Sequence, residues 1–177
     1  MYTYKSNALI AVSSLVGLVC ILFVGGIYAE PATKVAGKMT MEIVKSDTLA
    51  ITDTEGHHMF LQVYEGTNAK MGDNEFMAGA TISNSSFSDI VQGNGFHQGY
   101  VEFTKDDGTT FAQWKGKITT TTLAAGGTKV TSFEGRFSYI GGTGKYKNIQ
   151  GSGTYTGQFT SNTTLTADWE GEITIGE

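Results

Sequence analysis

Hydrophobic and polar residues alternate with a period of two along most of the chain after residue 35. The alternation is clearest over residues 112–118, 133–139, 151–159 and 165–175, where apolar residues or glycines alternate with polar or charged ones. Such a pattern indicates β-strands, because successive side chains of a strand point to opposite faces. One apolar and one polar face per strand is typical of an antiparallel sheet that is solvated on one side.

Weaker alternation over residues 38–43, 58–64, 76–83 and 99–103 predicts further strands, and no stretch after residue 35 has the period of a helix. Tight turns are expected at residues 106–108 and 124–127, and residues 84–95 are expected to form the one longer connection. Closure of such a sheet removes its exposed edges. We therefore predict an all-β fold, a single antiparallel closed barrel of about eight strands.

Four of the predicted strands share a motif in which an aromatic residue is followed by any residue and then by glycine. The motif occurs at Trp114–Gly116, Phe133–Gly135, Tyr155–Gly157 and Trp169–Gly171. Both residues of each motif fall on the apolar face. Glycine lets a strand bend sharply and a neighbouring ring can cover the missing side chain, so we interpret the motif as structural.

The N-terminal segment has the composition of an export signal. Residues 8–27 contain no charge and follow Lys5, and Ala29 offers a small residue for cleavage. We predict a signal peptide over residues 1–29, a short linker over residues 30–36 and a β-barrel domain over residues 37–177. The protein is then exported, either periplasmic or secreted. The alternative is a membrane anchor, because the apolar segment approaches the length of a spanning helix.

Charge and cysteine content exclude several classes of protein. The net charge is −5 and the basic residues form no run, which argues against a nucleic-acid partner. The single cysteine, Cys20, lies in the predicted signal peptide, so the exported domain has no disulfide. No serine lies in a nucleophile elbow. Glycosylation sequons begin at Asn84 and Asn162.

The histidines are the residues of the sequence that suggest a metal site. His57 and His58 are adjacent and cannot both point into a barrel, whereas His97 has the parity of the apolar positions on its strand. A histidine pair with Glu55 or Asp89 could hold zinc, but no histidine spacing typical of metal ligands is present. We predict no metal and no cofactor.

The segment from Tyr139 to Gly157, YIGGTGKYKNIQGSGTYTG, is rich in glycine but is not a phosphate-binding loop. Tyr139 replaces the first glycine of the phosphate-binding motif, and Tyr146 replaces the serine or threonine whose hydroxyl binds magnesium. A predicted strand follows, where the motif requires a helix. We expect turns and a slim strand instead. The glycines with this structural role are Gly141, Gly142, Gly144, Gly151, Gly153 and Gly157.

The same segment resembles the calycin-like β-barrels of allene oxide cyclases and dirigent proteins. The shared pattern is two glycines, a small hydroxyl residue, a glycine, an aromatic and a further glycine before two closing strands. The matching residues are Gly141, Gly142, Thr143, Gly144, Tyr146 and Gly151, and the resemblance covers residues 133–175. It implies a closed barrel and a homo-oligomer, a trimer in related barrels.

The catalytic residues of these families find no match. In an alignment on Gly56, the acid and the amide of the cyclases fall near Leu49 and Ile51. Dirigent proteins use acids and an arginine in the barrel mouth, but the one arginine of the domain, Arg136, has polar-face parity. Catalysis therefore stays an open question, and the sequence favours a protein that is not an enzyme.

The barrel interior is the best candidate site. The residues expected to line it are Phe133, Phe137, Tyr139, Tyr155, Phe159, Trp169 and His97. The leading hypothesis is a non-catalytic module that binds a small apolar ligand there. The first alternative is an isomerase or cyclase whose barrel steers a reactive intermediate. The second is an extracellular structural or interaction protein with a filled core.

Overall fold

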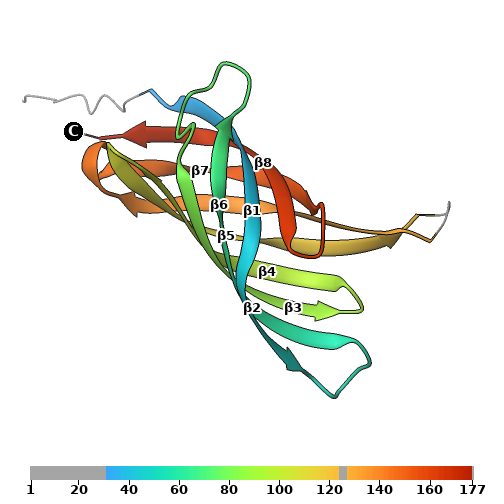
Figure 1. Ribbon diagram of the computed structural model, residues 1–177. Coiled ribbons are helices and arrows are strands. Elements are labelled where there is room, and N and C mark those ends of the chain that lie inside the picture. Colours follow the sequence, from blue (N-terminus) through green and yellow to red (C-terminus); the bar gives the residue numbers. More distant parts are fainter. Residues whose placement is uncertain (1–30, 124–126, 177) are drawn as a thin grey trace, which may run out of the picture.

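The structure, a computed structural model, describes residues 31–123 and 127–176 and forms an antiparallel β-barrel (Figure 1). The strands are β1 (Thr33–Ala50), β2 (His57–Lys70), β3 (Thr81–Val91), β4 (Asn94–Lys105), β5 (Gly108–Thr122), β6 (Lys129–Gly142), β7 (Ile149–Phe159) and β8 (Thr164–Ile175). A short 3-10 helix, η1 (Gly144–Tyr146), lies between β6 and β7. None of the described residues belongs to a helix long and apolar enough to span a membrane.

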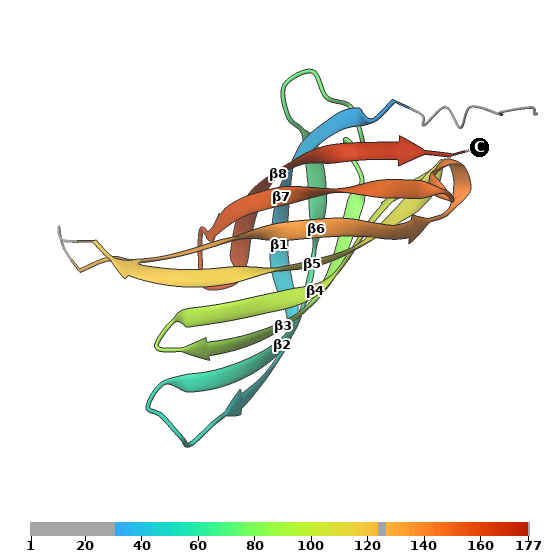
Figure 2. The same ribbon diagram turned by 180° about the vertical axis from the view of Figure 1, so that it is seen from behind.

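Each strand pairs antiparallel with the next one along the chain, and β8 pairs with β1 to close the barrel. The view from behind shows the hairpin ends of β1–β2, β3–β4 and β5–β6 extending together beyond the barrel body (Figure 2). The predicted all-β, eight-stranded closed barrel is thereby confirmed. The predicted signal peptide and most of the expected turn at 124–127 lie outside the described residues.

Two predicted boundaries in the first half of the chain are wrong. Strand β1 begins at Thr33, inside the expected linker of residues 30–36, because Val35 is buried and pairs with β8. Residues 84–95 are not a long connection but parts of β3 and β4. These strands are joined by the two-residue turn Gln92–Gly93, where both residues have positive φ, as in a type I′ hairpin.

The long connection is instead residues 71–80, which include part of the strand predicted over 76–83. This loop folds over one end of the barrel, where Met77 is 1% exposed. The Phe76 ring contacts the ring of Tyr146 from η1, with centroids 5.8 Å apart, and the ring of Trp169 at 6.3 Å. These apolar side chains close that end of the barrel.

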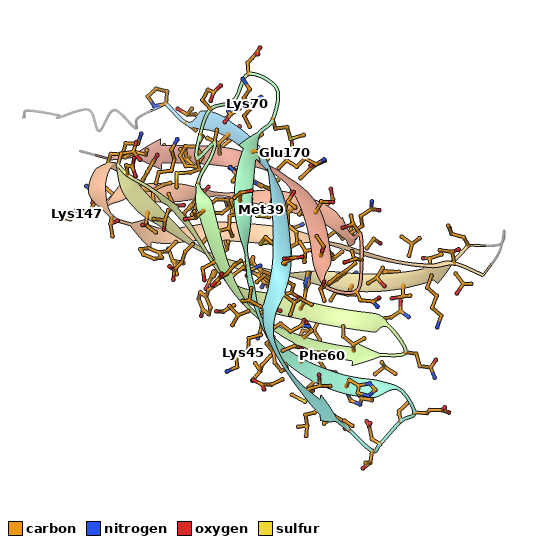
Figure 3. The ribbon with its side chains drawn as sticks, viewed as in Figure 1. Met39, Lys45, Phe60, Lys70, Lys147 and Glu170 are labelled. Atoms are coloured by element: carbon orange, nitrogen blue, oxygen red, sulfur yellow. The ribbon has the colours of Figure 1, made fainter. Side chains whose placement is uncertain are left out.

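Charged side chains lie on the outer face of the barrel. Lys70, Lys147 and Glu170 are exposed, while Met39 packs against the buried core (Figure 3). The core contains inward residues of all eight strands together with Met77, Ala80 and Tyr146. Burial alternates clearly along β3, β6 and β8, as expected when one face of a strand points inward. Arg136 is exposed on the outer face, as its parity predicted.

Aromatic residues inside the barrel lie directly opposite glycines on the neighbouring strand. The cross-strand pairs are Gly99 with Trp114, Gly157 with Phe133, Gly135 with Tyr155, Gly153 with Phe137 and Gly37 with Trp169. A Cβ atom at Gly153 would lie 2.6 Å from the Phe137 ring, and one at Gly37 would lie 2.7 Å from the Trp169 ring. The rings therefore lie flat across the wall, in space that only glycine leaves free.

The glycines of the segment from Tyr139 to Gly157 lie at the end of β6, in η1 and in β7. Gly141 and Gly142 end β6, and Gly144 starts η1 with φ of +57°. A side chain at Gly144 would meet the backbone of the β4–β5 turn, so both the backbone angle and the close approach favour glycine. The remaining three, Gly151, Gly153 and Gly157, lie in β7.

Candidate functional site

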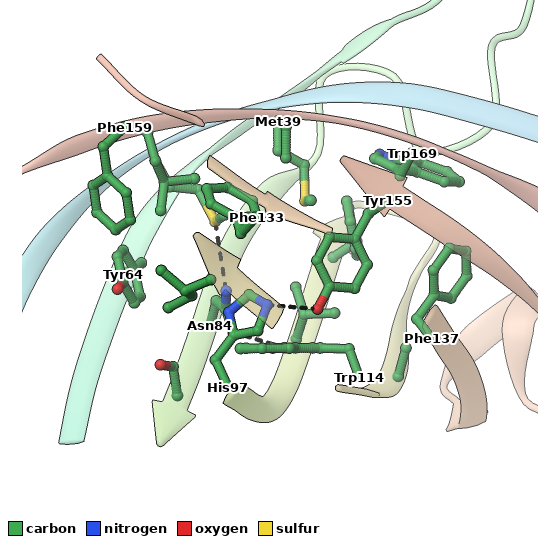
Figure 4. Close-up of a pocket in the computed structure, with 18 of the residues that line it drawn as sticks. Met39, Tyr64, Asn84, His97, Trp114, Phe133, Phe137, Tyr155, Phe159 and Trp169 are labelled. Atoms are coloured by element: carbon green, nitrogen blue, oxygen red, sulfur yellow. Dashed lines mark hydrogen bonds between the residues drawn. The ribbon is translucent and has the colours of Figure 1, made fainter. Parts of the chain in front are cut away.

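A cavity of about 70 Å³, measured as the space open to the centre of a water molecule, lies in the barrel interior (Figure 4). Every strand contributes to its lining. The residues from β1 to β4 are Met39, Met41, Tyr64, Asn84, Ser86, His97, Val101 and Phe103. The residues from β5 to β8 are Ala112, Trp114, Ile118, Phe133, Phe137, Tyr139, Tyr155, Phe159, Leu165, Ala167 and Trp169.

All seven residues that the sequence placed in the interior line this cavity. They are Phe133, Phe137, Tyr139, Tyr155, Phe159, Trp169 and His97. They lie together because period-two alternation fixes the face of the strand on which each side chain lies. Whether they bind a ligand is a separate matter, taken up below.

His97 and Tyr155 form the central polar contact of the cavity. His97 on β4 and Tyr155 on β7 belong to one lateral row of the wall, and the two positions between them are Gly116 and Gly135. With no side chain on either glycine, the Tyr155 ring reaches across β5 and β6. Its hydroxyl oxygen lies 3.0 Å from Nε2 of His97.

Burial keeps this histidine uncharged. His97 is 7% exposed and packs against the ring of Trp114, with centroids 4.8 Å apart. Burial lowers the pKa of His97 to about 4, although a backbone hydrogen bond with Glu134 opposes the shift. A neutral imidazole has one N–H donor and one acceptor nitrogen. If its N–H donates to the backbone carbonyl of Glu134, its other nitrogen, Nε2, accepts the hydrogen bond from the Tyr155 hydroxyl. Burial also raises the pKa of Tyr155, and the pair is neutral at pH 7.

Asn84 supplies a second polar group. Its carbonyl oxygen accepts a hydrogen bond of 3.0 Å from Nε1 of Trp114, which fixes the orientation of the amide. Its amide nitrogen has only the thioether sulfur of Met41, at 4.0 Å. Sulfur is a weak acceptor, so this buried donor remains available to an oxygen atom in the cavity. Nearby, burial raises the pKa of Tyr64 to about 12.

Sequence reasoning missed the polar residues of β3 because it assigned them to a loop. The signal was present: Asn84, Ser86 and Ser88 alternate between Ile82 and Ile90, and all five are buried. The period is two, but the middle positions are small and polar rather than apolar. The glycosylation sequon at Asn84 is therefore turned into the barrel, whereas Asn162 is exposed in the β7–β8 turn.

Of the other two histidines, His57 is separated from His97 by the barrel wall, and His58 lies on the opposite face of β2, opposite the buried Ile90. His57 lies on the outer side, where Nδ1 is 2.6 Å from Oδ1 of Asp53 and Nε2 is 2.7 Å from Oδ1 of Asp89. The side-chain hydrogen bonds to Asp53 and then Asp89 raise the pKa of His57. A site pairing His57 with His97 is thus ruled out by geometry. Within residues 31–123 and 127–176, no group of three or more histidines, cysteines or acids is arranged to hold a metal.

No protein family model matches the chain, and no curated protein matches it. Solved structures similar to the chain include two of pterocarpan synthase dirigent proteins. PsPTS1 is 11% identical, with a TM-score of 0.46, over 84% of this chain and 97% of that chain. GePTS1 is 10% identical, with a TM-score of 0.43, over 83% of this chain and 87% of that chain. Dirigent proteins are among the β-barrels that the glycine-rich segment resembles.

Proposed function

We propose that the barrel binds a small, largely apolar organic molecule in its interior, without transforming it. The observation that carries the proposal is the cavity of about 70 Å³ beneath an aromatic lining. A water molecule needs only about 10–15 Å³ in this measure, so the interior has room for a small molecule beyond a single water. Ligand sites are usually concave and apolar with few placed polar groups, and this cavity has that composition.

The polar groups of the lining suggest what such a ligand carries. The amide nitrogen of Asn84 is a buried donor whose one contact is a sulfur atom. A ligand oxygen, from a carbonyl or a hydroxyl, would satisfy it. Among the described residues that line the cavity there is no Asp, Glu, Lys or Arg, and His97 is neutral. The absence of a charged group favours a neutral ligand and supports binding over acid–base catalysis.

The ligand would enter from the end of the barrel at which the β1–β2, β3–β4 and β5–β6 hairpins turn, called the hairpin end below. Phe76, Met77 and Tyr146 close the opposite end. At the hairpin end, Phe159 and Ile118 lie at the edge of the lining and are only partly buried. An apolar molecule that reaches this end would meet aromatic and aliphatic side chains before it meets the polar pair His97 and Tyr155 inside the barrel.

Benzene and phenol test the proposal, because they differ by one hydroxyl group. Calorimetric titration of the protein with each should detect binding, and saturation should raise the thermal midpoint. Phenol should bind about fivefold more tightly, the value of one net hydrogen bond. Asn84→Val should remove most of that preference while benzene still binds. Absence of binding by both molecules would refute the proposal.

A pair of matched variants locates the site. Ala167→Leu fills the cavity, since Ala167 is 2% exposed and lines it. Gln158→Leu adds the same side chain on the exposed outer face of β7. The first variant should abolish binding of benzene and the second should retain it. If both variants bind equally, the ligand does not occupy the barrel interior.

A further inference from the structure

A second hollow lies on the outside of the barrel, over strands β4 to β7. It is an open groove of about 630 Å³. Its outward-facing residues are Phe96, Gln98, Lys115, Lys117, Glu134, Arg136, Thr154 and Thr156. These side chains point to solvent from the outer face of the strands, whereas Gly116 and Gly135 form the floor of the groove. His97 and Tyr155 line both this groove and the interior cavity.

Positive charge collects in this groove without a partner. Lys115 on β5 lies directly opposite Arg136 on β6, and Lys117 follows two residues later on the same face. Like charges at directly opposed positions repel and destabilise a sheet. Among the described residues, none of these three cations has a carboxylate within 4 Å, whereas several other lysines do. The paired lysines are Lys38, Lys45, Lys70 and Lys145.

This arrangement is unusual for a protein of net charge −5, in which acids outnumber cations. Glu134 lines one end of the groove opposite Lys117, but it forms no ion pair with the three cations. The uncompensated pair is therefore Lys115 and Arg136. The two positive charges repel each other, and an anion bound between the two side chains would offset that repulsion.

The floor of the groove allows close approach. Gly116 and Gly135 are opposed at this point of the wall, so no side chain supports the sheet from within except the Tyr155 ring that crosses them. Around the rim, Gln98, Thr154 and Thr156 offer side-chain donors. The guanidinium of Arg136 presents a planar fork suited to two oxygens of one group, and Lys115 adds a point charge opposite it.

We propose that the groove between Lys115 and Arg136 binds an oxyanion, namely a carboxylate, sulfate or phosphate group. Both cations lie on the outer face of the wall and neither lines the interior cavity, although the groove and that cavity share His97 and Tyr155. The sequence could not show it, because Lys115 and Arg136 are 21 positions apart in the printed numbering and meet only through the β5–β6 register. Their exposure leaves both free to reorient around the anion.

Titration of the full barrel domain with inorganic phosphate, sulfate and acetate tests this site. Backbone amide NMR shifts would be followed at constant ionic strength, with sodium chloride as the balancing salt. The largest shifts should centre on residues 115 and 136. The order of affinity among the three anions identifies the preferred group, and phenyl phosphate in place of phosphate shows whether an attached organic group adds contacts near Phe96.

Matched charge-removing variants decide the outcome. Lys115→Gln and Arg136→Gln should each weaken binding about tenfold, because each removes charge-assisted hydrogen bonds. Lys129→Gln removes an exposed lysine of the same strand β6, outside the groove, and should leave affinity unchanged. Binding of none of the anions, or equal weakening by Lys129→Gln, would overturn the proposal and leave only a general effect of charge.

Discussion

Because His97 is buried, the stability of the barrel should depend on pH in one direction. The imidazole is 7% exposed and its pKa falls to about 4, whereas an unfolded histidine titrates near 6.5. Above pH 6.5 both states are neutral and His97 adds no pH dependence. Between pH 6.5 and 4 only the unfolded state takes up the proton, so stability falls as pH falls. At about 1.4 kcal/mol per pKa unit, the full loss is about 3 kcal/mol.

Urea unfolding of the wild type and of His97→Gln at pH values from 4 to 7.5 measures this term. Carboxylates and the other histidines contribute equally to both proteins, so the difference between the two free energies of unfolding isolates His97. The variant also loses the hydrogen bond to Tyr155, but that cost is the same at every pH. The difference should shift against the wild type by about 3 kcal/mol between pH 7 and pH 4. Parallel pH profiles for the two proteins would refute the buried, neutral histidine.

Two further changes test the wall and the outer hydrogen-bond network. Gly153→Ala should lower the free energy of unfolding by about 1–3 kcal/mol, because its Cβ would clash with the backbone oxygen of Glu170 and lie 2.6 Å from the Phe137 ring. Chemical denaturation would check this, and wild-type stability would contradict the packing argument. Asp89→Asn should lower the raised pKa of His57 toward its ordinary value, as seen by NMR titration of the ring, with Asp53 still in place. The stabilisation from His57 is complete below pH 6.5 and is lost as pH rises through the raised pKa of His57. An unchanged His57 pKa in the variant would exclude Asp89 as a cause of the shift.

The second half of the fold was predictable because its strands carry strong apolar and aromatic alternation. Phe133 and Tyr155 could be placed inside the barrel from parity alone. Strand β3 could not, because Asn84 and Ser86 point inward and look like loop residues in a sequence. A polar residue at an inward position breaks the pattern from which strands are recognised, and two polar residues of this cavity, Asn84 and Ser86, lie on β3.

The candidate site was predictable as a set of side chains but not as an arrangement. His97 was expected to face inward, yet its bond to Tyr155 joins residues 58 positions apart. That contact depends on the register of four strands and on two glycines that leave the wall bare. Registers of this kind are set by turn geometry and by packing of the whole barrel, which a period-two pattern does not encode.

The closure of the barrel by β1 and β8 has a consequence for how the chain folds. Seven of the eight strand pairings join neighbours along the chain, but the eighth brings Thr33 opposite Ile173 and Met41 opposite Leu165. Ordering so long an intervening chain before the last ladder forms carries a large entropic cost, and topologies rich in distant contacts fold slowly. Until that ladder forms, β1 and β8 both present open edges and the inner rings face water. We expect the hollow interior to arise late in folding, with the joining of the first strand to the last.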